Sequence, residues 1–310
     1  LVGHGWHDVR AVDDWSYDMA TWRGAPCVLA QLEIERSDGS RQTVATDGTW
    51  LQVPSPVLYD DIREGETDDP SRARRAGPFP NGLHAAVVAG PAGRLVAEAH
   101  PGAKVCETIK PVSIKRMPPP YPGWMVDFGQ NMAGWLRLSI HGAKRGDVVT
   151  IQYGEKRDKS GINLSGADDF SRYPRSFLSL PGGWFQRDRH VCSGEDGEIY
   201  EPRFAYHGFQ YAHIDGVFPL TIGPDDVEAK FVRTAFPEAG TFECSNPTVN
   251  RIQHMVVSSY KSNFTDGYPT DCPTREKLGW TGDASLAAEA GLYNFQNAPA
   301  YEKWIRDILD

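Results

Sequence analysis

The spacing of hydrophobic residues changes once along this chain of 310 residues, and that change limits the folds the chain can adopt. Before about residue 237, apolar residues alternate with polar ones in many short segments, such as Ala30, Leu32 and Ile34, which is the period of a β-strand. After about residue 240 they recur every three to four residues, which is the period of an α-helix. Strands followed by consecutive helices predict a mainly β region and then a separate all-α domain.

The first 103 residues are expected to form one β domain. The alternation at 30–35 predicts a strand with one buried face, Ser37-Asp38-Gly39-Ser40 predicts a turn, and 42–45 predicts the second strand of a hairpin. The stretch 70–81 is rich in Pro and Arg and is therefore predicted to be a surface loop.

Residues 104–237 are expected to form a second β domain. Leu136, Leu138 and Ile140 alternate with polar neighbours, and further strands are predicted at 148–153, 177–180 and 209–214. Many short strands separated by Gly and Pro are typical of a β-sandwich.

Three helices are expected in residues 238–310. Asn246 can cap the first helix and Pro247 suits its first turn. The second helix is predicted to start near Asp283 and the third near Ala298. Each has an apolar stripe at helical spacing, so all three are predicted to pack in a helical domain.

Charge and cysteine usage exclude several classes of protein. The formal net charge of −9 argues against nucleic acid as a partner, and no apolar run is long enough to span a membrane. The five cysteines are scattered without a CxxC pair, which argues against a disulfide framework or a zinc site and favours a reducing compartment such as the bacterial cytoplasm. No metal or other cofactor is expected, and the oligomeric state is not predicted.

The densest group of chemically functional residues lies between the first two predicted helices, at 268–283. It contains three carboxylates (Asp271, Glu276 and Asp283), the cation Arg275 and the indole of Trp280. Hydrolysis of a glycosidic bond needs one carboxylic acid to protonate the leaving oxygen and further carboxylates around the sugar. The structural alternative is an ion-paired loop with a helix cap at Asp283.

One thirteen-residue segment of this loop has a specific order: Asp271-Cys272-Pro273-Thr274-Arg275-Glu276-Lys277-Leu278-Gly279-Trp280-Thr281-Gly282-Asp283. It resembles the signature at the catalytic mouth of bacterial α-L-rhamnosidases, glycoside hydrolase family 78. Three other segments resemble the same family in the same order, namely Gly129–Trp135, Glu201–Tyr211 and Phe242–Asn246. The resemblance implies two β-sandwich domains, 1–103 and a concanavalin-like 104–237, followed at 238–310 by the first helices of an (α/α)6 barrel.

The resemblance also implies roles for individual residues. Glu276 falls on the family's general acid, Asp271 and Asp283 on carboxylates that hold the rhamnose hydroxyls, and Arg275 and Trp280 on substrate-contacting positions. The family hydrolyses terminal α-L-rhamnose from glycosides with inversion, using a second Glu that is expected beyond the end of this chain. The chain lacks an initial Met and its helical pattern continues to its last residue, so it is expected to be truncated at both ends and inactive alone.

Other interpretations stay open at this point. A non-catalytic carbohydrate-binding protein on the same scaffold and an (α/α)6 glycosidase for another sugar are the alternative functions. The acidic run Tyr59–Glu66 lacks the spacing of a calcium loop and is predicted to be a solvated, ion-paired turn. Trp6 is expected in a sandwich core or at a domain interface rather than in a sugar site, and the nine His show no ligand spacing.

Overall fold

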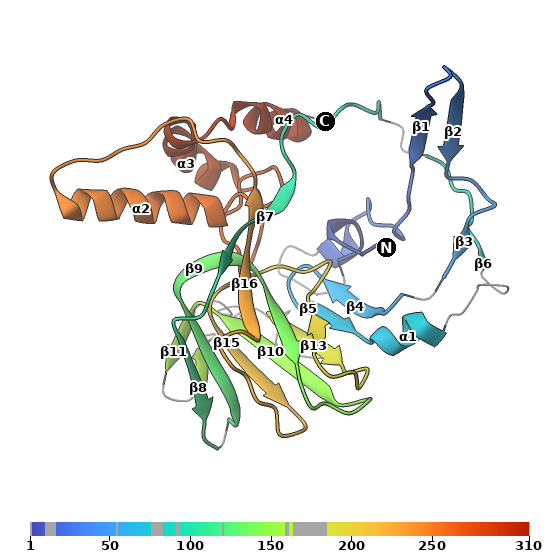
Figure 1. Cartoon of the computed structure of the whole chain (residues 1–310). Coiled ribbons are helices and arrows are strands. Elements are labelled where there is room, and N and C mark those ends of the chain that lie inside the picture. Colours follow the sequence, from blue (N-terminus) through green and yellow to red (C-terminus); the bar gives the residue numbers. More distant parts are fainter. Residues whose placement is uncertain are drawn as a thin grey trace.

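The computed structural model describes residues 2–9, 17–53, 55–75, 83–90, 93–119, 121–158, 161–163 and 185–309. Strands occupy the chain up to Thr234, and the long helices all follow Pro247, which confirms the predicted change from β to α (Figure 1). Two short 3-10 turns, Trp6–Asp8 and Tyr17–Met19, lie near the start of the chain. Among the described residues, no helix has the length and hydropathy of a membrane span.

The predicted hairpin forms, but it does not bury a face. Strands β1 (Gln31–Glu35) and β2 (Arg41–Ala45) pair in antiparallel register. Leu32 and Val44 lie opposite each other in this ladder, yet they are 57% and 40% exposed. The hairpin projects away from the main sheet (Figure 1). Among the described strands, β3 (Leu51–Gln52) pairs only with β6 (Leu83–His84).

The next segment joins the main sheet. Strands β4 (Val57–Asp61) and β5 (Gly65–Asp68) form a tight hairpin, and β5 pairs in parallel with β13. The predicted loop at 70–81 is corrected in its first part, because Pro70–Arg75 forms the short helix α1, which begins with Pro as first turns often do. Residues 76–81 lie outside the described part of the chain. The boundary predicted at residue 103 stays a prediction.

A large curled sheet forms the centre of the molecule, with the strand order β4-β5-β13-β10-β15-β9-β16-β7. Strands β8 and β14 also pair with β9, and β11 and β12 form a small separate ladder. The predicted strand at 177–180 lies outside the described residues. The strands after residue 100 are β7 Ala103–Ile109, β8 Ser113–Met117, β9 Gly123–Ile140, β10 Val148–Gly154, β11 Lys156–Asp158, β12 Gly161–Asn163, β13 Arg187–Val191, β14 Glu198–Tyr200, β15 His207–Gly216 and β16 Val227–Thr234.

Strand β9 is longer than the sequence pattern predicts and carries the curl of the sheet. Its first residues pair with β8 on one edge and with β15 on the other, its middle pairs with β15, and its last residues pair with β16 and β14. Gly134 lies at the bend with φ +153°, and a Cβ atom there would stand 1.9 Å from the carbonyl oxygen of Lys230. Only glycine therefore allows the two backbones to approach this closely. The side chains enclosed by the curl, among them Met132, Leu136 and Phe209, form the main core.

Helices α2 (Pro247–Ser262), α3 (Thr281–Asn294) and α4 (Ala298–Leu309) gather beyond one end of the sheet (Figure 1). The predicted cap is confirmed, because the Asn246 side chain accepts a hydrogen bond from the Thr248 N–H. A small aromatic core around Tyr260, Phe264 and Phe295 holds the helices together. Much of each apolar stripe is exposed instead, with Ile252 at 52%.

Candidate active site

The loop between α2 and α3 is closed on itself by hydrogen bonds to its own backbone. The Asp271 N–H donates to the Leu278 carbonyl oxygen at 3.0 Å, and the Leu278 N–H donates to Asp271 Oδ1 at 3.1 Å. At its start the Thr270 N–H donates to the Asn263 carbonyl oxygen at 2.8 Å, which ties the loop to the end of α2. Residues 271–278 therefore form a compact turn that presents Arg275 and Glu276.

Glu276 is buried at the centre of this turn, with 8% of its surface exposed. Its Oε1 atom accepts a hydrogen bond from Arg275 Nη2 at 2.5 Å, and its Oε2 atom accepts one from Trp280 Nε1 at 2.6 Å. The structure thus brings together three residues that the sequence singled out. Both carboxylate oxygens are engaged by donors that the resemblance assigns to substrate contact.

The other two carboxylates lie in different environments. Asp271 is partly buried, and burial raises its pKa, as does the nearby negative charge of Glu276. Asp283 is exposed in the first turn of α3, where a carboxylate is favoured by the helix dipole. The structure gives Asp283 no capping hydrogen bond, and Trp280 occupies the N-cap position without a side-chain cap. The structural alternative is therefore confirmed in part, because Arg275 and Glu276 form an ion pair in the loop, but the cap at Asp283 does not form. The predicted catalytic role of Asp283 stays a prediction.

The turn at residues 61–64, here called the 61–64 turn, supports the loop from the β4–β5 hairpin. The prediction that Tyr59–Glu66 is solvated is wrong, since Asp61 and Arg63 are 1% and 0% exposed. Arg63 donates from Nε and Nη2 to the carbonyl oxygen of Glu276, both at 3.3 Å. A charged turn from the β region thus contacts the backbone of the central glutamate.

Lys277, the residue after Glu276, is a second support that the sequence did not reveal. Its ammonium donates to the carbonyl oxygens of Ile62 and Tyr206, and it lies 4.1 Å from the centre of the Tyr206 ring. Its backbone has φ +56°, which is uncommon for a residue other than glycine. Burial lowers the pKa of Lys277 to about 7, and the charge of Arg63 acts in the same direction. The Asp-Asp-Ile-Arg-Glu run gave no local signal of these contacts, because a run of opposed charges is ordinarily solvated.

Aromatic residues complete the junction. Trp6 donates from Nε1 to the Tyr268 hydroxyl at 3.0 Å, and the Arg63 guanidinium lies 4.8 Å from the centre of the Trp6 ring. The Tyr268 hydroxyl in turn donates to the Lys277 carbonyl oxygen at 3.1 Å. Trp6 therefore lies at an interface between the first residues and the loop, which was one of its two predicted places.

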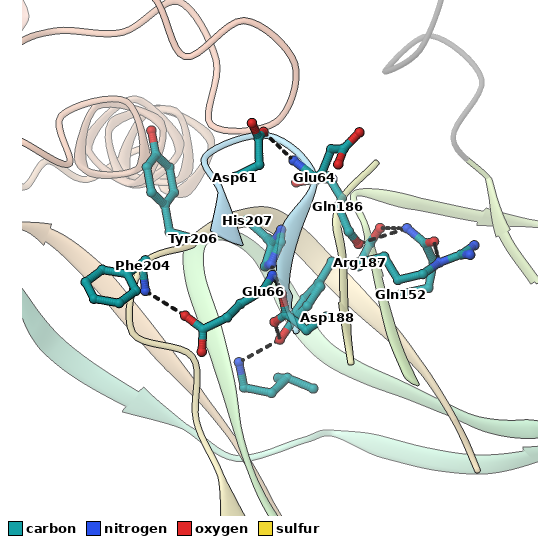
Figure 2. Close-up of polar contacts among 12 residues, drawn as sticks. Asp61, Glu64, Glu66, Gln152, Gln186, Arg187, Asp188, Phe204, Tyr206 and His207 are labelled. Carbon is teal, nitrogen blue, oxygen red and sulfur yellow. Dashed lines mark hydrogen bonds and ion pairs between the residues drawn. The ribbon is translucent and has the colours of Figure 1, made fainter. Parts of the chain in front are cut away.

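A buried polar network lies beneath the 61–64 turn, and Figure 2 shows its side chains between the strands. Asp188 accepts hydrogen bonds from the Glu66 N–H and the Tyr153 hydroxyl, both at 2.9 Å, and its Oδ1 lies 2.9 Å from His207 Nε2. Glu66 Oε2 accepts hydrogen bonds from the N–H groups of Arg203 and Phe204. Burial raises the pKa of Glu66 to about 7. These contacts fix β5 on the sheet and thereby fix the 61–64 turn.

Comparison with known proteins gives matches along almost the whole chain. Residues 1–107 match the α-L-rhamnosidase N-terminal domain, and residues 120–233 match the bacterial α-L-rhamnosidase concanavalin-like domain. Residues 237–310 match the bacterial α-L-rhamnosidase six-hairpin glycosidase domain.

Individual relatives agree with these matches. An α-L-rhamnosidase of Formosa agariphila is 30% identical over 99% of this chain and 32% of its own length. An α-L-rhamnosidase of Streptomyces avermitilis is 29% identical over 92% of this chain and 27% of its own length. The solved α-L-rhamnosidase of Dictyoglumus thermophilum superposes with a TM-score of 0.81 at 30% identity, covering 92% of this chain and 31% of that one. The Streptomyces avermitilis α-L-rhamnosidase solved in complex with L-rhamnose superposes with a TM-score of 0.81 at 26% identity. The match covers 98% of this chain and 28% of that one. The chain spans about a third of the length of these relatives.

Proposed function

The chain belongs to the bacterial α-L-rhamnosidase family, and from that premise we propose that the complete protein hydrolyses terminal, non-reducing α-L-rhamnosides. The observation that best supports this proposal is the position of Glu276, which is buried between Arg275 and Trp280 and lies close enough to Asp271 to affect it electrostatically. A carboxylic acid held beside a guanidinium, an indole and a second carboxylate is suited to protonating a sugar oxygen while its neighbours hold the ring.

In the proposed reaction the Glu276 carboxyl first takes up a proton from solvent and then donates it to the glycosidic oxygen, which leaves Glu276 as the carboxylate. Its two carboxyl oxygens each accept one hydrogen bond, from Arg275 and from Trp280, and one hydrogen bond does not saturate a carboxyl oxygen, so a sugar oxygen can approach the same group. The guanidinium and the indole lie beside the acid, where they can also contact the sugar, which agrees with the substrate-binding role proposed for both. Asp271 and Asp283 are proposed to accept hydrogen bonds from rhamnose hydroxyls and to stabilise the positive charge that develops on the ring.

The proposed stereochemical outcome is inversion. Inverting enzymes place the acid and a water-activating carboxylate on opposite sides of the sugar, roughly 6.5–9.5 Å apart. On the family pattern the second carboxylate is a glutamate downstream of residue 310, so the test needs the complete protein. No metal or other cofactor enters the proposed reaction.

The test compares two substrates in the complete protein and its Glu276→Gln variant. Loss of a general acid should lower kcat/KM by roughly 10²–10⁴-fold for an alkyl rhamnoside, whose leaving group needs a proton, and by much less for a nitrophenyl rhamnoside. Glu289→Gln, an exposed change on α3, is the matched control and should leave both values unchanged. Near-wild-type turnover of the alkyl substrate by the Gln variant would remove Glu276 from the acid role.

Two further measurements separate the alternatives. An NMR spectrum recorded before mutarotation should show β-L-rhamnose as the first product, and α-L-rhamnose would contradict inversion. Activity on aryl glucosides but not on aryl α-L-rhamnoside would favour a glycosidase for another sugar, and binding of rhamnose without turnover of any glycoside would favour a carbohydrate-binding protein.

A further inference from the structure

A second group of potentially reactive side chains lies inside the curled sheet, away from the loop that carries Glu276. Among the described residues, His190, Cys192 and Glu198 place one ligand atom each within 4.8 Å of one another. His190 is 1% exposed, Cys192 is 0% exposed, and the Glu198 side chain is 7% exposed. From this geometry we propose that His190, Cys192 and Glu198 bind a zinc ion that links two strands of the sheet.

The alternation of the strands explains why the three side chains meet. Along β13, Asp188 and His190 face inward, and Cys192 follows at the next inward position. Along β14, Glu198 and Tyr200 face inward while Ile199 between them is 51% exposed. Because β13 pairs with β10 and β14 pairs with β9, the proposed ion would connect strands with different partners in the sheet.

His190 is oriented as a metal ligand. Its Nδ1 atom lies 2.7 Å from Asp68 Oδ1, which is the arrangement in which a carboxylate fixes the ring of a metal-bound histidine. Its Nε2 atom is buried without a hydrogen-bond partner and lies 3.6 Å from Glu198 Oε2. In a tetrahedral zinc site each nitrogen or oxygen ligand lies about 2.0–2.2 Å from the metal, so two such ligand atoms lie about 3.4 Å apart. The separation of 3.6 Å between His190 Nε2 and Glu198 Oε2 is close to that value.

Glu198 is also held in place by the backbone. Both of its carboxylate oxygens accept a hydrogen bond from the Ser193 N–H, at 3.1 Å and 2.8 Å. One sulfur, one imidazole nitrogen and one carboxylate oxygen form a donor set that zinc accepts, whereas magnesium and calcium prefer oxygen alone. Zinc binds the thiolate, so uptake of the ion would release the Cys192 proton to solvent.

The sequence did not indicate this site, because the ligands do not follow the usual spacing of zinc motifs. His190 and Cys192 are separated by one residue, which places both on one face of a strand, and the third ligand comes from the next strand of the chain. The sequence predicted that the protein binds no metal, and a bound zinc ion at this site would contradict that prediction. Because the proposed ion lies inside the sheet and away from the loop, its proposed role is to stabilise the sheet, with a water molecule as the fourth ligand beside the three side chains.

The test measures metal content and stability, so it does not depend on the proposed hydrolysis. The complete protein, purified without chelator, should contain about one zinc per chain. Cys192→Ser and Glu198→Gln should each lose most of it, while Cys106→Ser, which changes a partly buried cysteine outside the group, should keep it. Asp68→Asn should retain the ligands but bind zinc roughly 10–100-fold more weakly.

Two readouts exclude a merely structural effect of these substitutions. Replacement of zinc by Co²⁺ should give a thiolate-to-cobalt charge-transfer band that is absent from Cys192→Ser, and zinc added to chelator-treated wild type should raise Tm. A protein that contains no zinc and whose Tm does not change on zinc addition would overturn the proposal. Equal loss of zinc from Cys106→Ser and Cys192→Ser would overturn it as well.

Discussion

The buried ammonium of Lys277 gives a quantitative prediction for stability. The pKa of Lys277 is about 7 in the folded protein against an ordinary value of 10.5 in the unfolded chain. Between these two pH values the unfolded chain binds more protons than the folded protein, so the free energy of unfolding must rise with pH across that interval. The stabilisation is lost as the pH falls toward 7. Over each pH unit in which the unfolded chain holds one more proton, the free energy of unfolding rises by about 1.4 kcal/mol. Lys277 is about half protonated in the folded protein at pH 7, so the total rise between pH 7 and pH 9 is about 2 kcal/mol.

Lys277→Met removes the titrating group while nearly keeping the volume of the side chain. The variant also leaves the carbonyl oxygens of Ile62 and Tyr206 without their donor, but that cost does not vary with pH. The stability of the wild type relative to the variant should therefore increase by about 2 kcal/mol from pH 7 to pH 9. The same substitution at Lys104, which is exposed on β7, is the control and should give a difference that does not change with pH.

The assay is urea unfolding of the complete protein followed by tryptophan fluorescence at pH 7, 8 and 9. Each stability is taken as a difference from wild type at the same pH, so that other titrating groups cancel. Parallel curves for wild type and Lys277→Met would refute the reasoning, because they would show that the ammonium has the same proton affinity in the folded and unfolded chains.

Three other substitutions test separate parts of the fold. Arg63→Lys keeps a cation but removes the paired donors to the Glu276 carbonyl oxygen, and it should lower kcat of the complete protein roughly tenfold, or by about 1.4 kcal/mol, with little change in KM. Gly134→Ala should destabilise the protein by roughly 3 kcal/mol in thermal unfolding, while Gly142→Ala, where a Cβ atom meets nothing within 4 Å, should cost only about 1 kcal/mol. Asn246→Ala should cost about 1 kcal/mol and speed hydrogen exchange in the first turn of α2.

Features determined by neighbouring residues could be predicted from the sequence. The cap at Asn246 and the turn at 37–40 depend on side chains and dihedral preferences within a few residues, and both form as expected. The grouping of Arg275, Glu276 and Trp280 could also be predicted, because the three residues are close in sequence, whereas their roles stay predictions. Burial was harder, since the apolar positions of β1 and β2 alternate correctly and still face solvent.

Features determined by distant residues could not be predicted. Strand β9 continues past its own alternating segment because β8, β15 and β16 offer partners along its length. The 61–64 turn looks like a solvated turn, since nothing near it in sequence reveals that its guanidinium reaches a backbone carbonyl 213 residues away. A strongly charged segment is ordinarily solvated, and only the tertiary contact makes its burial favourable.

The contact between the 61–64 turn and the Glu276 carbonyl also has a consequence for the order of events during synthesis. Arg63 and Glu276 are separated by 213 residues, so a ribosome that adds about 5–20 residues per second incorporates Glu276 roughly 10 to 40 seconds after Arg63. Throughout that interval the side chains of Asp61, Arg63 and Glu64 can stay hydrated. The turn at residues 271–278 can therefore acquire its final shape only after the strands that hold the 61–64 turn have been synthesised.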